Sequence, residues 1–205
     1  MFENVDLYFV LAVVIAYLLG SISPSTILAK AQGKDIKKEG SGNAGTTNTL
    51  RVLGKKAAVI TLIVDIGKGI LAVSLAYLIS TPEAAMVSAL AAFCGHVWPL
   101  YFGFKGGKGV AVAFGAVLRL NWQLALMMAL LLVAVVLITR MVSVGSLAVG
   151  IAFPVCCWFM YREFFWIGLI MALIMIYNHR GNIVRLMNHE ENKLDLSKLI
   201  YKKDE

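Results

Sequence analysis

Near its start the chain contains VDLYFVLAVVIAYLLGSISPSTILAKA, residues 5–31, which is almost uninterruptedly apolar. A helix needs about 20 apolar residues to cross the hydrocarbon core of a bilayer, and this stretch is long enough. Its second half contains small and kinking residues that favour close packing against a neighbouring helix, namely Gly20, Ser21, Ser23, Pro24 and Ser25. The stretch therefore predicts a first membrane helix with a kink in its second half.

The composition of the whole chain agrees with a membrane protein. Of the 205 residues, 60% are hydrophobic and only 15% are charged, which is too apolar for a soluble domain of this size. The net charge of +7 does not indicate nucleic-acid binding, because the basic residues gather in short connections rather than on one amphipathic face. The three cysteines lie in apolar runs without the spacing of a metal site, so we expect no bound metal.

Further apolar runs predict the remaining membrane helices. They occupy residues 57–79, 84–104, 110–118, 124–138, 144–158 and 164–176. The run 110–118 is too short to cross at about 1.5 Å per residue, so the count is six if it joins the next run and seven if it is separate. Residues 32–56 are rich in Lys and Arg, which places them in the cytoplasm and the N-terminus outside. Only an odd number of crossings returns the basic C-terminal tail, from about residue 178, to the cytoplasm.

These observations predict an all-α fold, a polytopic transmembrane bundle of about seven helices, some of them short or broken. We expect residues 1–205 to form one domain with its C-terminus in the cytoplasm. Asp65 and Lys68 lie near the middle of the second apolar run, where they form either a cavity wall or, as we favour, a structural ion pair. The neighbouring Gly67 and Gly69 allow a break in that helix. His96 is expected to be a hydrogen-bonded packing residue.

The first cytoplasmic connection contains EGSGNAGTTN, residues 39–48, followed by Arg51, Lys55 and Lys56. Glycines and small polar residues expose backbone N–H groups, and the basic residues add positive charge, a combination that suits a phosphate group. The alternative is a flexible basic loop between two helices. A second glycine-rich stretch, KGGKG at residues 105–109, has the same character but lacks the glycine spacing of a Walker A loop.

A third polar segment follows the last apolar run. In helical conformation His179, Asn182 and Arg185 share one face, which either points into the same cytoplasmic pocket or is a solvated helix end.

Together these segments resemble the acyl-phosphate:glycerol-3-phosphate acyltransferase family of bacteria. The resemblance is carried by SGNAG at 41–45 with Thr47, Asn48 and Arg51, by GFKGGKGVA at 103–111, and by His179, Asn182, Ile183 and Arg185. The spacing and hydrophobic profile match over nearly the whole chain. The resemblance implies a seven-helix enzyme of the bacterial inner membrane, embedded in membrane lipid, with its active site on the cytoplasmic face. Family members transfer a fatty acyl group from acyl phosphate to the 1-hydroxyl of glycerol 3-phosphate, giving lysophosphatidate, and use no acyl-CoA, metal or other cofactor.

The resemblance also implies roles for individual residues. Ser41, Arg51, His179 and Asn182 match residues that the family needs for activity. We expect substrate or phosphate binding from the two loops, from a small hydroxyl in the connection 139–143 and from the third segment, namely from Gly42, Asn43, Gly45, Asn48, Lys105, Gly106, Gly107, Lys108, Gly109, Ser143 and Arg185. The chain departs from the family pattern at Asn178, at Gly181 and at His189-Glu190-Glu191, which leaves the structure of the tail open. The tail to Glu205 is expected to be dispensable for the chemistry.

Acyl phosphate is already an activated anhydride, so the enzyme chiefly has to hold two anionic substrates side by side and stabilise developing charge. His179 either acts as general base or orients a substrate phosphate that takes the proton, and the sequence favours the second. Ser41 is expected to donate a hydrogen bond rather than to form an acyl-enzyme. The rival functions are a transporter of a phosphorylated metabolite, which should show an internal repeat, and a metal-dependent lipid phosphotransferase, which needs clustered aspartates.

Overall fold

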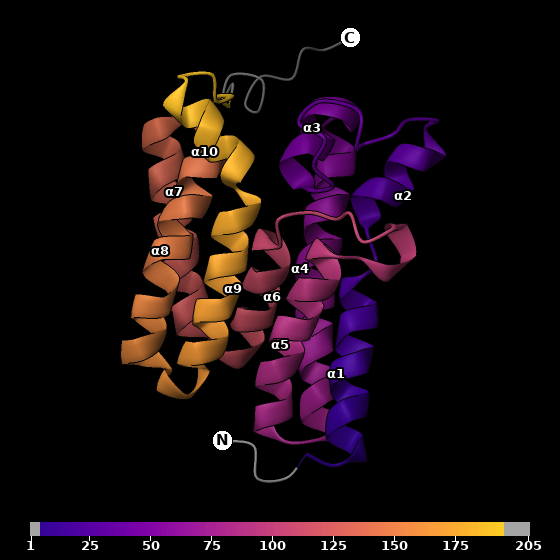
Figure 1. The fold of residues 1–205 in the computed structure, drawn as a ribbon, viewed down its shortest axis with the longest axis vertical. Helices are drawn as coiled ribbons and strands as arrows, with labels where there is room; N and C mark the ends of the chain where they lie inside the picture. Colours follow the sequence, from indigo (N-terminus) through magenta and orange to yellow (C-terminus); the bar gives the residue numbers. More distant parts are fainter. Residues whose placement is uncertain (1–4, 195–205) are drawn as a thin grey trace.

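The computed structural model describes residues 5–194, and these residues form helices and connections without any strand (Figure 1). The long helices run roughly parallel to the long axis of the molecule, whereas three short helices lie together at one end (Figure 1). The predicted all-helical membrane fold is confirmed. Of the tail that we expect to be dispensable for the chemistry, only the part up to residue 194 is described. The rest lies outside the described residues.

The helices form two groups joined by one short helix (Figure 1). In the first group α1 (Leu7–Gly20), α4 (Lys55–Ile79) and α5 (Pro82–Val97) contact one another. In the second, α8 (Val142–Met160) contacts both α7 (Trp122–Thr139) and α9 (Phe165–Asn178). Between the groups, α6 (Val110–Leu120) contacts α4, α5 and α7. The short helices are α2 (Pro24–Ala31), α3 (Thr46–Leu53) and α10 (Arg180–Met187), with single 3₁₀ turns at Leu100–Phe102 and Arg162–Phe164.

The first apolar stretch forms two helices because its small residues interrupt it at residues 21–23. Ser23 caps α2 by accepting a hydrogen bond from the Thr26 N–H, and Pro24 occupies the first turn, where its missing N–H costs nothing. The kink predicted from the sequence is therefore a complete break, and it leaves the Ile22 carbonyl free to accept a hydrogen bond from another helix.

The break allowed at Gly67 and Gly69 does not occur, since α4 is a continuous helix of 25 residues. Gly69 instead permits close packing, because a Cβ there would lie 2.4 Å from the Val112 carbonyl oxygen. Gly115 on α6 has the same function, since its Cβ would lie 2.1 Å from the Ile66 carbonyl oxygen. The glycines bring the backbones of α4 and α6 together, as small residues do in membrane helix pairs.

Five helices among the described residues are long and apolar enough to cross a membrane, counting α1 with α2 as one span. The helices α9 and α10, which meet at a bend of 52°, together form a sixth candidate. With 11 residues, α6 extends only about 16 Å, roughly half of the hydrocarbon thickness. The predicted total of seven membrane helices thus depends on whether α6 crosses the membrane, and it stays a prediction.

Candidate active site

A cavity of about 400 Å³ lies between the two helix groups. Its polar wall comes from the loop before α3, from α3 itself, from Lys108 before α6, and from the segment around α10. Its apolar wall comes from α6, α7, α8 and α9 and includes Phe114, Ala129, Phe153 and Met171. The cavity therefore combines a cationic polar end with an apolar channel between membrane helices.

Asn48 organises the first glycine-rich loop from inside. Its side chain is buried, its Oδ1 accepts from the Ser41 N–H at 2.8 Å, and its Nδ2 donates to the carbonyls of Ile36 and Glu39 at 3.1 and 3.0 Å. Gly40 is required beside it, because its φ is +60° and a Cβ would lie 2.2 Å from Asn48 Oδ1. Since the Asn48 amide uses both of its donors within the loop, it places Ser41 at the cavity rather than offering an N–H to a substrate.

Downstream of Ser41, the loop leads directly into α3. Asn43 lines the cavity, and Gly45 is the N-cap of α3 without any side-chain cap. Thr46 and Thr47, in the first turn, also line the cavity. The Thr46 hydroxyl is buried and has no hydrogen-bond partner among residues 5–194. The uncapped start of a helix exposes backbone N–H groups and the positive end of the helix dipole, an arrangement that suits an anion.

The second glycine-rich loop uses its glycines for close packing. The N–H groups of Gly106 and Gly107 donate to the carbonyls of Val97 and His96 at 3.0 and 3.1 Å, so they are not free to bind a phosphate. A Cβ on Gly106 would lie 1.9 Å from the His96 carbonyl oxygen. Gly109 has a φ of +85°, and a Cβ there would lie 2.2 Å from the Phe93 ring. The loop is thereby folded against the end of α5, and this leaves Lys108 directed into the cavity.

Lys108 begins a chain of polar contacts that runs into the third segment. Its Nζ donates to Asn182 Oδ1, Asn182 Nδ2 donates to Glu191 Oε1 at 2.8 Å, and Glu191 Oε2 accepts from Arg185 Nε at 2.9 Å. Asn182 and Glu191 are buried. Arg185 is therefore neutralised by Glu191, whereas Arg51, which also lines the cavity, has no hydrogen bond or ion pair within the described part of the chain.

Burial determines the charge state of this end of the cavity. It lowers the pKa of Lys108 to about 8, with Glu191 opposing the shift and Arg185 and Arg51 adding to it. Burial also acts to raise the pKa of Glu191, but the hydrogen bonds from Asn182 and Arg185 outweigh it, and the pKa lies below its ordinary value. At neutral pH the polar end therefore holds three cations, Lys108, Arg51 and Arg185, and one anion.

His179 is buried at the turn between α9 and α10, and it lines the same cavity. Its Nδ1 lies 2.8 Å from the Met175 carbonyl oxygen, which can only accept a hydrogen bond. Nδ1 therefore carries the proton, and Nε2 of the neutral ring carries a lone pair. A histidine held in this tautomer can accept a hydrogen bond or a proton from a hydroxyl group.

The structure brings most of the predicted residues to the cavity. The predicted residues that line it are Ser41, Asn43, Gly45, Asn48, Arg51, Lys108, Gly109, Ser143, His179 and Asn182. The others lie outside the lining, namely Gly42, Lys105, Gly106, Gly107 and Arg185. Lys105 is exposed, and the Gly42 N–H donates to the Glu39 carbonyl at 3.0 Å.

Sequence reasoning missed several residues of the cavity wall. Asn192 and Glu191 belong to the tail that was expected to be dispensable, yet both line the cavity, and Glu191 connects Asn182 with Arg185. No periodic pattern marks them, because they follow α10 in an irregular segment. Asp65, for which a cavity wall was one of the two alternatives, both lines the cavity and pairs with Lys68, and His96, expected to be a packing residue, lines the cavity as well.

Comparison with known proteins gives a consistent result. Residues 10–189 match the family model for glycerol-3-phosphate acyltransferase. Proteins of that name are similar to the chain in Clostridioides difficile, with 43% identity over 93% of the chain and 97% of the relative, and in Shouchella clausii, with 41% identity over 89% and 94%.

Two crystal structures of PlsY, an integral membrane glycerol 3-phosphate acyltransferase, also match. Its glycerol 3-phosphate form has a TM-score of 0.88 and 34% identity, and its lysophosphatidic acid form has a TM-score of 0.85 and 33% identity. Each match covers 95% of this chain and 99% of the other.

Proposed function

Because the chain belongs to the glycerol-3-phosphate acyltransferase family of integral membrane enzymes, we propose that its acyl donor is acyl phosphate and its product lysophosphatidate. The fatty acyl group moves to the 1-hydroxyl of glycerol 3-phosphate at the cytoplasmic face of the bacterial inner membrane. The observation that carries this proposal is the cavity, which joins a cationic polar end to an apolar channel between helices. The two PlsY forms, with glycerol 3-phosphate and with lysophosphatidic acid, support the acceptor and the product.

The polar end suits two phosphate groups at once. Two phosphates held close together repel each other, and this repulsion has to be offset by nearby cations and N–H donors. Arg51 and Lys108 are cations that line the cavity, and the uncapped start of α3 adds backbone N–H groups. We assign Lys108 to the phosphate of glycerol 3-phosphate and Arg51 with the α3 terminus to the acyl phosphate.

The reaction requires little covalent assistance. The 1-hydroxyl oxygen attacks the carbonyl carbon of acyl phosphate, a new C–O ester bond forms, and the C–O bond to phosphate breaks with its electron pair leaving on the phosphate. The Nε2 lone pair of His179 accepts the hydroxyl proton, a role that its hydrogen bond to the Met175 carbonyl supports over the orientation of a phosphate. The Ser41 hydroxyl, placed by Asn48, donates to the developing oxyanion.

An assay with purified protein tests the donor and the product together. Labelled glycerol 3-phosphate and palmitoyl phosphate are supplied in EDTA without CoA, and labelled lysophosphatidate is expected; palmitoyl-CoA in place of palmitoyl phosphate should give none. Lys108→Ala should raise the KM for glycerol 3-phosphate at least about tenfold, because a charge-assisted hydrogen bond is lost, and should raise the KM for palmitoyl phosphate less.

The matched control is Lys38→Ala, which removes an exposed lysine paired only with Asp35 and should leave both KM values unchanged. Turnover with palmitoyl-CoA but not with palmitoyl phosphate would refute the proposed donor. Equal increases in both KM values would place Lys108 elsewhere.

A further inference from the structure

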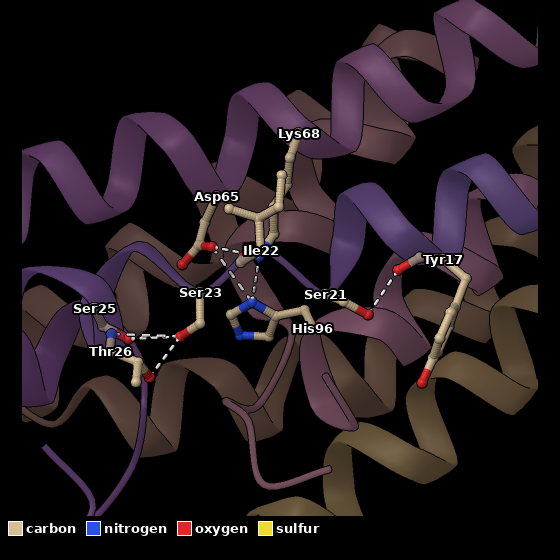
Figure 2. A network of polar contacts seen from close by, with 9 residues as sticks. All are labelled: Tyr17, Ser21, Ile22, Ser23, Ser25, Thr26, Asp65, Lys68 and His96. Atoms are coloured by element: carbon tan, nitrogen blue, oxygen red, sulfur yellow. Dashed lines mark hydrogen bonds and ion pairs between the residues drawn. The ribbon is translucent and has the colours of Figure 1, made fainter. Parts of the chain in front are cut away.

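Asp65, Lys68 and His96 form a buried polar cluster, and all three side chains are at most 6% exposed. Lys68 Nζ lies 2.8 Å from Asp65 Oδ1, 3.0 Å from His96 Nδ1 and 2.6 Å from the Ile22 carbonyl oxygen in the break between α1 and α2 (Figure 2). A lysine ammonium has N–H donors and no acceptor, so Nζ donates to the Ile22 carbonyl and to His96 Nδ1 and forms an ion pair with the Asp65 carboxylate. The cluster thus joins α4, α5 and the α1–α2 break.

This arrangement determines which nitrogen of His96 carries the proton. Nδ1 faces the Lys68 ammonium at 3.0 Å, whereas the Asp65 carboxylate oxygen is farther away at 3.4 Å. A proton on Nδ1 would point at a cation, so Nδ1 accepts and the neutral imidazole carries its proton on Nε2. Figure 2 shows Nε2 on the side of the ring that faces away from Lys68. His96 therefore presents a fixed N–H donor, in contrast to His179, whose free nitrogen is an acceptor.

The His96 donor points to the place where both glycine-rich loops meet, next to the cavity that His96 lines. A Cβ built on Gly107 would lie 2.2 Å from His96 Nε2 and 2.8 Å from the Ala44 carbonyl oxygen. His96 also lines the cavity. Within residues 5–194 its Nε2 has no hydrogen-bond partner. A donor without a protein partner beside a cavity can bind a ligand oxygen, and the proposed ligand at this end is rich in acceptor oxygens.

We propose that the Nε2–H of His96 binds an oxygen of glycerol 3-phosphate, and that Lys68 and Asp65 act as positioning residues that hold the imidazole in this tautomer. This inference rests on the proposed function, because it assigns a further ligand of the same substrate. It also gives a chemical reason for Gly107, since any side chain there would displace the imidazole edge. Substitution of His96 should leave the binding of acyl phosphate unchanged.

Two substitutions separate the two ring nitrogens. In His96→Asn the short amide occupies the place of Nδ1 and can still accept from Lys68, but nothing replaces the Nε2–H. In His96→Gln the longer amide places an N–H near the position of Nε2. We expect His96→Asn to raise the KM for glycerol 3-phosphate about five- to tenfold, the value of one lost hydrogen bond, and to leave the KM for palmitoyl phosphate within about twofold. His96→Gln should keep both KM values within about threefold of the wild type.

Hydrogen exchange distinguishes substrate binding from a merely structural role. The amides of Gly106 and Gly107 are hydrogen-bonded to the end of α5, and their exchange should be the same in His96→Asn and in the wild type. Faster exchange in His96→Asn would show that His96 only supports the loop, and equal KM values for the Asn and Gln variants would also overturn the proposal. If His96→Asn does not fold, His96→Phe, which keeps the ring but lacks the N–H, takes its place with the same expected result.

The failure of this inference can be distinguished from a failure of the proposed function. If the wild type forms no lysophosphatidate from palmitoyl phosphate, the proposed donor fails, and calorimetric binding of glycerol 3-phosphate then replaces the KM. The wild type and His96→Gln should bind it with similar affinity, and His96→Asn about five- to tenfold more weakly. Equal affinity of all three proteins would refute the role of His96.

Discussion

Lys108 is the residue whose charge state should control the pH dependence of acceptor binding. Its pKa is lowered to about 8 by burial, so the free enzyme loses this charge as the pH rises through 8. Glycerol 3-phosphate is a dianion at these pH values, because the second pKa of a phosphate monoester is about 6. The KM for glycerol 3-phosphate should therefore be nearly constant from pH 6.5 to 7.5 and rise toward about tenfold per pH unit above 8.

Lys108→Arg provides the control for this pH dependence, because a guanidinium stays charged to about pH 12. Its KM for glycerol 3-phosphate, whatever its absolute value, should not rise between pH 7.5 and 9.5. Initial rates at each pH, corrected for spontaneous hydrolysis of palmitoyl phosphate, measure both profiles. A wild-type KM that is flat up to pH 9.5 would contradict the assignment of Lys108.

The buried pair of Lys68 and Asp65 predicts a strong effect on stability. Lys68→Met leaves the Asp65 carboxylate buried without its cation, which typically costs about 3–5 kcal/mol of unfolding free energy. Adding Asp65→Asn removes the uncompensated charge, so the double variant should be more stable than Lys68→Met alone. Denaturant unfolding in detergent measures the difference, and a double variant less stable than the single one would show that the charge is not the cause.

At the scale of elements, the helices α7, α8 and α9 set the depth of the apolar channel. Met171 lies eight residues before His179 on α9, and Phe153 lies ten residues after Ser143 on α8, so the channel extends about 12–15 Å below the polar end. The channel should therefore discriminate acyl chains by length.

Ala129 on α7 lines this channel and is only half-buried, so a larger side chain there reduces the space. Ala129→Phe should lower kcat/KM for palmitoyl phosphate about tenfold or more and affect octanoyl phosphate much less. Leu130→Phe is the matched control on the same helix, because Leu130 is 62% exposed on the outer face and should tolerate the larger ring. Equal losses for the two donors in Ala129→Phe would indicate a general packing defect instead.

At the scale of the whole molecule, the polar segments that line the cavity lie at the end where α2, α3 and α10 gather (Figure 1). This end should face the cytoplasm, because it contains the Lys- and Arg-rich connection before α4. Cysteines placed at the exposed positions Lys38, Lys105 and His189, in a chain whose three native cysteines are alanine, should react with a membrane-impermeant thiol reagent only in inside-out vesicles.

Glu163, in the connection between α8 and α9, is the control for the opposite side. Glu163→Cys should react in intact cells after the outer membrane is permeabilised. Labelling of the first three positions from opposite sides would refute the proposed orientation and the single polar end. If Glu163→Cys and His189→Cys both reacted from the unexpected side while the cysteines at Lys38 and Lys105 did not, an even number of crossings would follow, and α6 would then not cross.

Much of the site could be predicted from sequence because motif residues and hydropathy are local properties. The three polar segments of the wall were all identified, and so was a kink after Gly20, which in the structure is a complete break. The roles of individual atoms were not predictable. Glu191 has no local pattern, and Gly67 and Gly69 suggested a broken helix although α4 is continuous and Gly69 serves its contact with α6.

By itself the sequence determined that this protein is an all-helical membrane protein with three polar segments near one surface, because hydropathy and residue spacing act over about 20 neighbouring residues. Only the tertiary structure decided which polar atoms remain free at the cavity. The amides of Asn48, Gly106 and Gly107 are occupied, whereas Lys108, Arg51 and the two unlike histidine nitrogens are directed to it. The physical reason is that each of these atoms is satisfied or left free by partners far away in the chain, and packing alone brings those partners together.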